Sequence, residues 1–258
     1  MSKKRKLVLK PWVRNTITVI LLGVIAFSAF NIIKIKLDES NTIKLQNEFK
    51  LPSIKEDDKD AQQETYTDRF NRLKELNGDF LGWISFESGL LDLPFLKTTD
   101  NDFYLTKNLK KEYSSHGTVF QDYLQNLDGR NITLYGHYVY NNKDLMFTPL
   151  VELRDQANYE KNKIFSLFLE NKELKYQVVG IIKYSLNDLP LYQVGDLTDE
   201  EFRDFKAYVN KNRLYDTGIQ IEDDDKLASL QTCVRNEDDT RWLVIGKLIE
   251  EKEIKWKQ

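Results

Sequence analysis

Cys233 is the only cysteine of the chain, and it lies near the end of a short apolar run, residues 227–234. A second run of strand-forming residues covers 242–248, and acidic, turn-forming residues occupy 236–239 between the two runs. This pattern predicts a hairpin with Arg241 at the start of its second strand. Paired strands lie about 5 Å apart, so the hairpin would bring a thiol close to a guanidinium. A lone cysteine forms no intrachain disulfide, which leaves packing or chemistry as its role.

A histidine stands at the end of another apolar stretch. Residues 131–137 read Asn-Ile-Thr-Leu-Tyr-Gly-His, which predicts a strand that ends in Gly-His. The chain has only two histidines, so few groups can exchange a proton with the cysteine. The other, His116, lies in a Ser-Ser-His-Gly turn and is expected at the surface. Arg235 lies in the predicted hairpin turn and is expected to face water.

Thiol, imidazole and guanidinium together suit acyl transfer. A Cys233 thiolate can attack an amide carbonyl, which gives a thioester and releases an amine. The His137 imidazole can protonate the leaving amine and then take a proton from an incoming amine. Arg241 carries a fixed positive charge and several donors, which suit the negative oxygen that develops during attack. The backbone N–H of Val234 is a second candidate donor to that oxygen.

A strand ending in Gly-His, a later strand ending in Thr-Cys and an arginine on the next strand together resemble the sortases. These are the membrane-bound cysteine transpeptidases of Gram-positive bacteria. The details resemble class B, from about residue 66 to about residue 250. Four segments carry the resemblance: Leu134-Tyr135-Gly136-His137 followed by Met146-Phe147, Leu230-Gln231-Thr232-Cys233 with seven residues before Arg241, residues 77–84, and residues 117–123.

The resemblance implies that Cys233 is the nucleophile, His137 the acid and base, and Arg241 the donor to the oxyanion and the substrate carbonyl. By position, Tyr135 and Gln231 are implied to line the peptide groove, because each lies two residues before a catalytic member. Gln231 stands where a serine is more usual in class B, so the preferred sorting motif stays open.

The roles of Thr232 and Arg241 each have an alternative explanation. Thr232 matches the Thr-Cys pair of the family, but an ordinary β-branched strand residue would look the same. Arg241 can also form an ion pair with Asp238 or Asp239, whether or not it contacts substrate.

The composition describes one ordinary folded domain with appendages, because 41% of the 258 residues are hydrophobic and 31% are charged. Many short strand-forming runs with few helical ones predict a mainly β fold and a closed or nearly closed barrel. The resemblance implies a closed eight-stranded sortase-type β-barrel with N-terminal helices and one long helix inserted between late strands. Residues 198–213 lie where that helix belongs. Thr198 caps this stretch, and apolar residues recur at helical spacing.

Three smaller elements are also predicted. Phe70, Leu73 and Leu76 are expected to form the buried face of a helix that ends at Asn77. Residues 144–153, after His137, are expected to form a short helix. Residues 163–170 and 174–184 are expected to pair as a hairpin.

The N-terminal part of the chain predicts a membrane anchor. Residues 1–36 carry eight basic residues and no acidic ones, and residues 15–33 contain no charge. A bilayer core of about 30 Å needs about 20 such residues as a helix. We therefore expect a cytoplasmic basic segment (1–14), a transmembrane signal-anchor helix (15–33), an extracytoplasmic stalk (34–64) that is partly helical at 43–49, and a catalytic domain (65–258) outside the cell. A cleaved signal peptide is the alternative.

The charge distribution argues against nucleic acid as a partner. The chain has a net charge of −3, and its first 36 residues contribute +8, so the remainder carries −11. Binding to phosphates depends on basic side chains, which an acidic body does not offer in excess. A single cysteine excludes a disulfide scaffold and a cysteine-rich zinc site. The acidic run 223–225 is expected to be a solvated turn, so neither a metal nor a cofactor is predicted.

The function expected from this pattern is a transpeptidase that cleaves the C-terminal sorting signal of surface proteins. The acyl group would pass to an amine of the peptidoglycan. Three alternatives stay open: a class B pilus polymerase that joins pilins through a lysine amine, a hydrolytic cysteine peptidase, and a non-catalytic membrane-tethered β-barrel binding module. Nothing in the chain resembles the lid of the usual pilus sortases, which favours anchoring to the cell wall.

Overall fold

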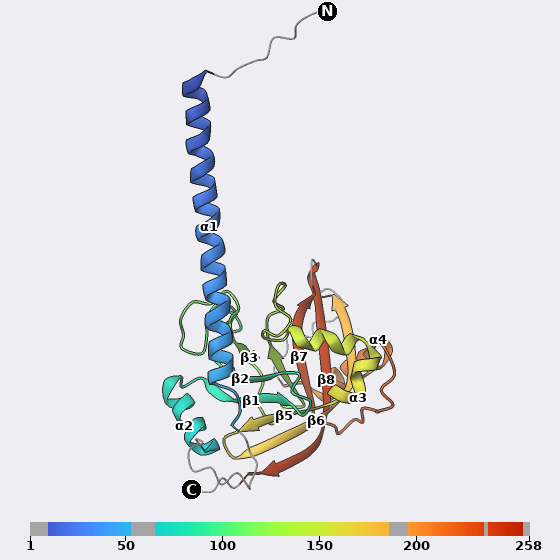
Figure 1. Cartoon of the computed structure of the whole chain (residues 1–258). Helices are drawn as coiled ribbons and strands as arrows, with labels where there is room; N and C mark the ends of the chain where they lie inside the picture. Colours follow the sequence, from blue (N-terminus) through green and yellow to red (C-terminus); the bar gives the residue numbers. More distant parts are fainter. Residues whose placement is uncertain (1–9, 53–64, 186–195, 235–236, 255–258) are drawn as a thin grey trace, which may run out of the picture. The chain divides into compact units, whose positions relative to one another are not determined.

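A computed structural model describes residues 10–52, 65–185, 196–234 and 237–254 (Figure 1). The chain divides into two compact units, residues 1–41 and residues 42–258. The α-helices are α1 (Pro11–Glu48), α2 (Tyr66–Leu76), α3 (Tyr159–Asn162) and α4 (Asp199–Asn212). The 3-10 helices are η1 (Phe103–Leu105), η2 (Thr148–Arg154) and η3 (Gln156–Asn158). The strands are β1 (Phe80–Phe86), β2 (Asp92–Leu96), β3 (Val119–Gln121), β4 (Asn131–Tyr135), β5 (Ile164–Leu169), β6 (Lys172–Ser185), β7 (Leu227–Val234) and β8 (Glu237–Glu253).

The eight strands close into a barrel in the order β1-β2-β3-β4-β7-β8-β6-β5, with α2, α3 and α4 outside it (Figure 1). Six neighbouring pairs are antiparallel, and the pairs β2–β3 and β4–β7 are parallel. Closure leaves no free sheet edge among the described strands, because each of them has two hydrogen-bonded neighbours. Helix α4 lies between β6 and β7 in the chain. The predicted eight-stranded barrel with an inserted late helix is therefore confirmed.

Side chains that alternate along the strands fill the barrel. Leu134 on β4, Leu230 on β7 and Val244 on β8 are buried and belong to the main core cluster, together with the ring of Phe165. Successive side chains of β7 point to opposite faces of the sheet, as in any strand. Leu227, on the opposite face of β7 from Leu230, belongs instead to a cluster that packs under α4.

Helix α4 begins as its sequence predicts. The Thr198 hydroxyl accepts a hydrogen bond from the backbone N–H of Glu201, and the Glu201 carboxylate accepts one from the Thr198 N–H. These two bonds satisfy N–H groups that a helix start otherwise leaves unpaired. Phe202, Phe205 and Val209 are buried against the barrel. The result is a helix fixed beside β6 and β7.

Helix α2 differs from the prediction at its last residue. Phe70 and Leu73 are buried, but Leu76 is 43% exposed. Leu76 is the last residue of the helix, and it lies past the packed face. The helix begins after Thr65, whose hydroxyl accepts from the Asp68 N–H, and it ends where the Asn77 N–H donates to Leu73 O.

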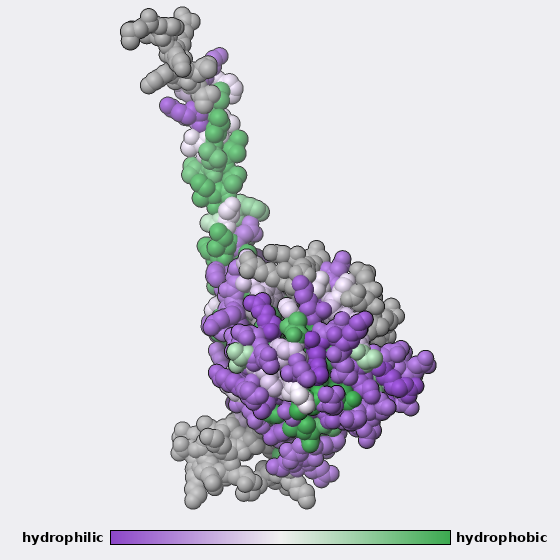
Figure 2. All heavy atoms as spheres, turned by 90° about the vertical axis from the view of Figure 1, so that its right-hand side faces the viewer, coloured by the Kyte–Doolittle hydropathy of each residue, from purple (hydrophilic) through white to green (hydrophobic). Residues whose placement is uncertain are grey.

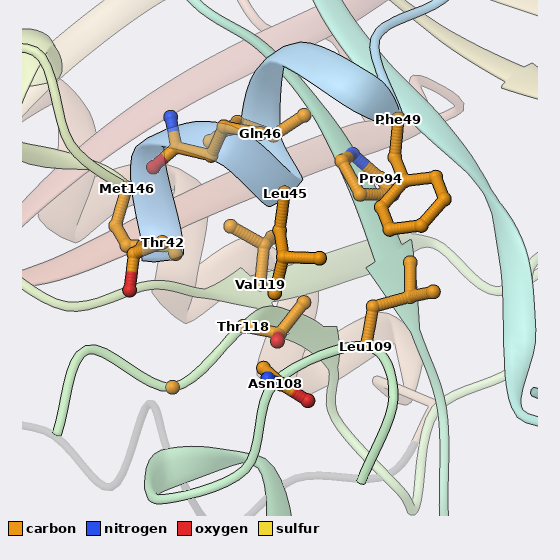
Figure 3. A pocket seen from close by; sticks show the side chains of 12 residues that line it. Thr42, Leu45, Gln46, Phe49, Pro94, Asn108, Leu109, Thr118, Val119 and Met146 are labelled. Atoms are coloured by element: carbon orange, nitrogen blue, oxygen red, sulfur yellow. The ribbon is translucent and has the colours of Figure 1, made fainter. Parts of the chain in front are cut away.

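The predicted stalk is partly incorporated into the folded body. Helix α1 runs without a break to Glu48, and residues 42–52 belong to the compact unit that contains the barrel. Phe49 is only 1% exposed, and its carbonyl accepts a hydrogen bond of 2.7 Å from Trp83 Nε1. Figure 3 shows Leu45 and Phe49 beside a small apolar pocket that Leu109 and Val119 also line. The rest of the predicted stalk, residues 53–64, lies outside the described residues.

Within the described residues, α1 is the one helix long and apolar enough to cross a membrane by length and composition. Its large hydrophobic side chains between residues 17 and 37 are exposed. Figure 2 shows this part of the helix as mostly hydrophobic, whereas the face of the barrel unit seen in that view is largely hydrophilic. The predicted basic segment 1–14 is described only from residue 10 onward.

Two other local predictions need correction. The predicted turn 236–239 is shorter, because β8 already begins at Glu237, whose backbone pairs with Val234. Arg235 lies outside the described residues. The predicted helix at 144–153 is the 3-10 helix η2, which starts at Thr148 with a proline in its first turn. Strands β5 and β6 pair as the predicted hairpin.

Candidate active site

The candidate site lies where two parallel strands end. Tyr135, the last residue of β4, pairs with Gln231 of β7, and the Gly136 N–H donates to Gln231 O over 3.1 Å. Parallel strands run in the same direction, so their C-terminal ends meet at one edge of the barrel. His137 follows β4 at this edge, and Cys233 lies two residues beyond Gln231. Residues 96 positions apart in the sequence are thus brought to the same place.

Because side chains alternate along a strand, the candidate site residues at the two strand ends lie on the face opposite the core. Leu134 and Leu230 point into the core, so Tyr135 and Gln231 lie on the other face of the strands. Cys233 shares the face of Gln231, because residues two apart on a strand point the same way. Cys233 is half-buried, and it lines a cleft that reaches solvent.

Arg241 lies directly opposite Cys233 on the neighbouring strand. The two form the last regular pair of the β7–β8 ladder before the register shifts between Cys233 and Val234. Such a shift bends a strand and re-aims its side chains. The Arg241 Nη1 donates to the carbonyl of Thr240 over 3.0 Å, which helps to fix the guanidinium.

One cleft of about 320 Å³ contains the predicted residues. Six of the seven predicted site residues line it: Tyr135, His137, Gln231, Thr232, Cys233 and Arg241. Its other lining residues are Asn101, Leu105, Thr118, Phe120 and Gly136. The seventh, Val234, ends β7 next to Cys233 and was predicted to act through its backbone N–H, so its side chain is not required.

A backbone carbonyl orients His137. Its Nε2 lies 2.8 Å from Leu105 O, and a carbonyl oxygen only accepts, so Nε2 must be the donor. A neutral imidazole carries one proton, which this bond assigns to Nε2. Nδ1 is then the nitrogen that can gain or lose a proton while the bond is kept. The bond therefore indicates the tautomer and leaves Nδ1 as the nitrogen available for proton exchange.

Thr232 has a buried hydroxyl with no partner among the described residues. Thr232 is 2% exposed, and its Oγ1 is one of four buried side-chain oxygens for which the described part of the chain supplies no hydrogen bond. A buried hydroxyl without a partner is costly. Thr232 also lines the cleft, but its buried hydroxyl leaves open whether the residue contacts a peptide or is an ordinary β-branched strand residue.

Gln231 and Tyr135 are both held by neighbours. The Tyr184 hydroxyl donates to Gln231 Oε1, and the Tyr135 hydroxyl donates to Asp122 Oδ2 over 2.7 Å. Burial, and then the negative charge of Asp122, raise the pKa of Tyr135 above its usual value. Tyr135 therefore stays protonated at physiological pH and keeps its proton directed at the carboxylate.

His116 is not at the surface, contrary to the prediction. It is 9% exposed, and its Nδ1 lies 3.4 Å from the hydroxyl of Thr42 near the end of α1. The turn-like sequence around His116 is thus covered by a segment more than 70 residues earlier in the chain. His116 does not line the cleft, which agrees with its having no role in the predicted chemistry.

Four cleft residues were assigned no role from the sequence: Asn101, Leu105, Thr118 and Phe120. Two signals could have found three of them. Asn101 lies in the turn-forming run before η1, and Thr118 and Phe120 lie in the segment 117–123 that carries the resemblance. Their chemistry depends on a backbone carbonyl and on long-range packing, which residue type alone does not reveal.

The acidic run 223–225 forms ion pairs rather than a metal cluster. Asp223 pairs with Lys206, and Asp225 pairs with Lys247. Within residues 10–52, 65–185, 196–234 and 237–254, no group of three or more His, Cys, Asp or Glu side chains is arranged to hold a metal ion.

Two curated proteins resemble the chain over most of its length. Sortase B of Staphylococcus aureus is 29% identical over 220 residues, which cover 83% of this chain and 86% of that protein. Sortase B of Listeria monocytogenes is 26% identical over 247 residues, which cover 93% of this chain and 98% of that protein. No family model matches the chain.

Solved structures show the same fold. The X-ray structure of Clostridium perfringens sortase B matches with a TM-score of 0.64 and 29% identity, over 70% of this chain and 99% of that one. The Staphylococcus aureus sortase B–substrate complex matches with a TM-score of 0.68 and 26% identity, over 83% of this chain and 97% of that one. The predicted resemblance to the class B sortases is therefore confirmed: over most of its length, the chain is like sortase B in both sequence and fold.

Proposed function

We propose that this chain is a membrane-anchored cysteine transpeptidase that cleaves the C-terminal sorting signal of surface proteins. Cys233 would hold the acyl group as a thioester and pass it to an amine of the cell-wall peptidoglycan. One observation carries the proposal: a thiol, an imidazole and a guanidinium line a single cleft at the ends of β4, β7 and the paired strand β8.

The geometry supports a two-step acyl transfer. In the first step the Cys233 thiolate attacks the carbonyl carbon of the scissile amide, and Arg241 stabilises the negative oxygen that forms. Nδ1 of His137 takes the thiol proton of Cys233 when the thiolate forms, and the C–N bond breaks as His137 gives that proton to the leaving amine. The acyl group is now a thioester on Cys233, and the bond to Leu105 O still holds the other side of the imidazole.

The second step reverses these roles with a new amine. The incoming amine attacks the thioester carbonyl and loses a proton to Nδ1 of His137. Arg241 again stabilises the oxyanion, and the C–S bond breaks to release the thiolate and the new amide. The enzyme returns to its starting protonation state, so the two steps require no cofactor.

Two complexes of similar proteins support the choice of ligands. One is the Staphylococcus aureus sortase B–substrate complex, and another is a sortase B complexed with a glycine tripeptide, whose TM-score with this chain is 0.68 at 25% identity. A triglycine carries a free terminal amine, which is the chemical group that the second step requires.

The apolar stretch of α1 supports an anchor. Residues 15–33 are free of charge and lie in a helix of sufficient length, and the basic residues before them favour a cytoplasmic N-terminus. We place the barrel outside the cytoplasm for this reason, where cell-wall precursors and surface proteins meet.

Product analysis tests the proposal directly. The full-length chain in detergent micelles is incubated with a panel of labelled sorting-signal peptides, first alone and then with triglycine or a lysine-containing pilin peptide. We expect a peptide–triglycine product that the Cys233→Ala variant does not form. Transpeptidation by that variant would contradict the proposal. Products joined only to lysine would indicate a pilin polymerase, and hydrolysis unaffected by any amine would indicate a peptidase.

A further inference from the structure

A buried carboxylate lies behind the cleft and does not touch it. Asp122 follows β3 and is only 1% exposed, and it is not among the residues that line the cleft. Placing an ionised carboxylate in the interior is costly unless hydrogen bonds satisfy its oxygens. The bonds that Asp122 accepts therefore point to its role.

Two of these bonds come from residues of the cleft wall. Asp122 Oδ2 accepts from the Tyr135 hydroxyl over 2.7 Å and from Asn101 Nδ2 over 2.9 Å. Its Oδ1 accepts from the backbone N–H of Leu124 over 2.9 Å, which holds the carboxylate itself. Tyr135 and Asn101 come from β4 and from the loop before η1, and both line the cleft. A single carboxylate thus ties together two segments that are not adjacent in the chain.

Both cleft residues are held at more than one point. The Asn101 Oδ1 accepts from the Tyr123 N–H over 3.1 Å, so both ends of its amide are fixed. The Tyr135 ring packs against Phe120, with ring centroids 5.3 Å apart. Because the Tyr135 hydroxyl donates its proton to Asp122, its oxygen has only acceptor sites left for any other partner. Asn101 keeps one N–H that Asp122 does not engage.

We infer that Asp122 is a positioning residue for the acyl-donor peptide. It fixes the Tyr135 hydroxyl and the Asn101 amide on one wall of the cleft, so that this wall is formed before the peptide arrives. Preorganised groups lose less entropy on binding, so the carboxylate acts on peptide affinity rather than on the reacting atoms. The expected effect on the KM for the peptide rests on the proposed function.

Asp122→Asn tests this inference with little change in shape. An amide has one acceptor oxygen, whereas the carboxylate accepts on both sides. If the new oxygen faces Leu124, the new NH₂ group meets the Asn101 Nδ2, which is also a donor. If the amide turns around, the Leu124 N–H loses its acceptor. At least one bond is therefore lost in either orientation.

The first measurement separates binding from chemistry. With the full-length chain in micelles, we expect Asp122→Asn to raise the KM for the sorting peptide about tenfold or more and to change kcat less than about threefold. The rate at which a small methanethiosulfonate reagent modifies Cys233 should stay at the wild-type value. Asp92→Asn is the matched control, because Asp92 also accepts a backbone N–H bond but lies outside the cleft. A folded Asp122→Asn variant with an unchanged KM would overturn the inference.

The second measurement does not depend on catalysis. In an ¹⁵N-labelled chain, the side-chain amide signals of Asn101 are assigned by their loss in Asn101→Ala. Asp122→Asn should move these signals upfield and speed their hydrogen exchange. Signals that stay in place would overturn the inference, even if the wild-type chain acylated no peptide and the proposed function failed.

Two further variants decide the matter if Asp122→Asn does not fold. Tyr135→Phe and Asn101→Ala each remove one donor to Asp122 and leave the carboxylate in place. We expect both to raise KM, and Tyr135→Phe to displace the Asn101 amide signals, because the two donors share Oδ2. An unchanged KM in both variants would overturn the inference.

Discussion

Cys233 and Arg241 face each other across the β7–β8 ladder, at the last regular pair before its register shifts. Their placement depends on two strands that are neighbours in the chain. The end of β4, which delivers His137, comes from almost a hundred residues earlier and joins them through the parallel pairing with β7. The site therefore combines one local and one long-range relationship, and each can be disturbed separately.

Removal of the guanidinium tests the local relationship. We expect Arg241→Ala to lower the acylation rate about 10²- to 10³-fold, because the oxyanion loses its charged donor. Arg241→Lys keeps the charge but loses the planar fork, so its rate should lie between those of Arg241→Ala and the wild type. Single-turnover acylation by a sorting peptide measures the effect. An Arg241→Ala rate within about threefold of the wild type would exclude an oxyanion role of the usual size.

A methyl group added at Gly136, next to His137, tests how tightly the end of β4 is packed. A Cβ on Gly136 would lie 2.6 Å from Cγ of the fully buried Phe147 ring. We expect Gly136→Ala to destabilise the chain by about 1–3 kcal/mol and to lower activity, because the ring or the backbone that carries His137 must move. Denaturant unfolding measures the stability. Gly78→Ala is the control, since nothing lies within 4 Å of its Cβ position. Equal stability of the two variants would contradict the packing argument.

The end of α1 should behave as part of the barrel unit. Phe49 is 1% exposed, and the cationic groups of Arg72 and Lys110 each lie 5.7 Å from its ring centroid. We expect Phe49→Ala to lower the free energy of unfolding by about 3–5 kcal/mol. Leu76→Ala, at a position 43% exposed, should change it by less than about 0.5 kcal/mol. Tryptophan fluorescence reports the transition, because Trp83 is buried and bonds to Phe49 O. A neutral Phe49→Ala would show that this segment is dispensable to the fold.

Asp92 makes the stability depend on pH. Burial raises the pKa of its carboxyl from 3.8 to about 6, although the Leu51 N–H bond opposes part of this shift. The folded state therefore binds the proton more tightly than the unfolded state, so this contribution to stability is fully present below about pH 4 and is lost as the pH rises through about 6. The loss above about pH 7 is about 3 kcal/mol.

Asp92→Asn should remove this penalty. The amide oxygen can still accept from Leu51, and no charge is buried. We expect the variant to be more stable than the wild type at about pH 7.5, with a difference that shrinks toward zero as the pH falls to about 4. Denaturant melts across this pH range measure the effect. A difference that stays constant with pH would show that the Asp92 pKa is not raised.

Much of the architecture could be predicted because its signals are local. The capping pair of Thr198 and Glu201 lies within one helical turn, and the strand that ends at Tyr135 is a short run rich in strand-forming residues. The hairpin that places Arg241 opposite Cys233 is local as well. Only the resemblance to a known family connected His137 to Cys233, since neither composition nor periodicity reveals that β4 pairs with β7.

The errors arose where distant segments decide the outcome. His116 reads as a surface turn, but the end of α1 covers it. Phe49 was predicted to end a helical part of a stalk that spaces the domain from the membrane, yet it is buried and lines a small pocket of the barrel unit. Leu76 continues the spacing of the buried face but follows the last turn that packs. Asp122 lies in a segment that the resemblance covers, and its chemical role becomes visible only through Tyr135 and Asn101.

Capture of the acyl-enzyme tests the central claim most directly. The full-length chain is mixed with a sorting-signal peptide, quenched in acid and measured by intact mass and peptide mapping. The account predicts an added mass equal to the N-terminal acyl fragment, bound to Cys233 and lost within seconds to minutes when triglycine is added before the quench. The same treatment of His137→Ala should give far less adduct. An adduct on any other residue, or peptide turnover by Cys233→Ala, would contradict the account.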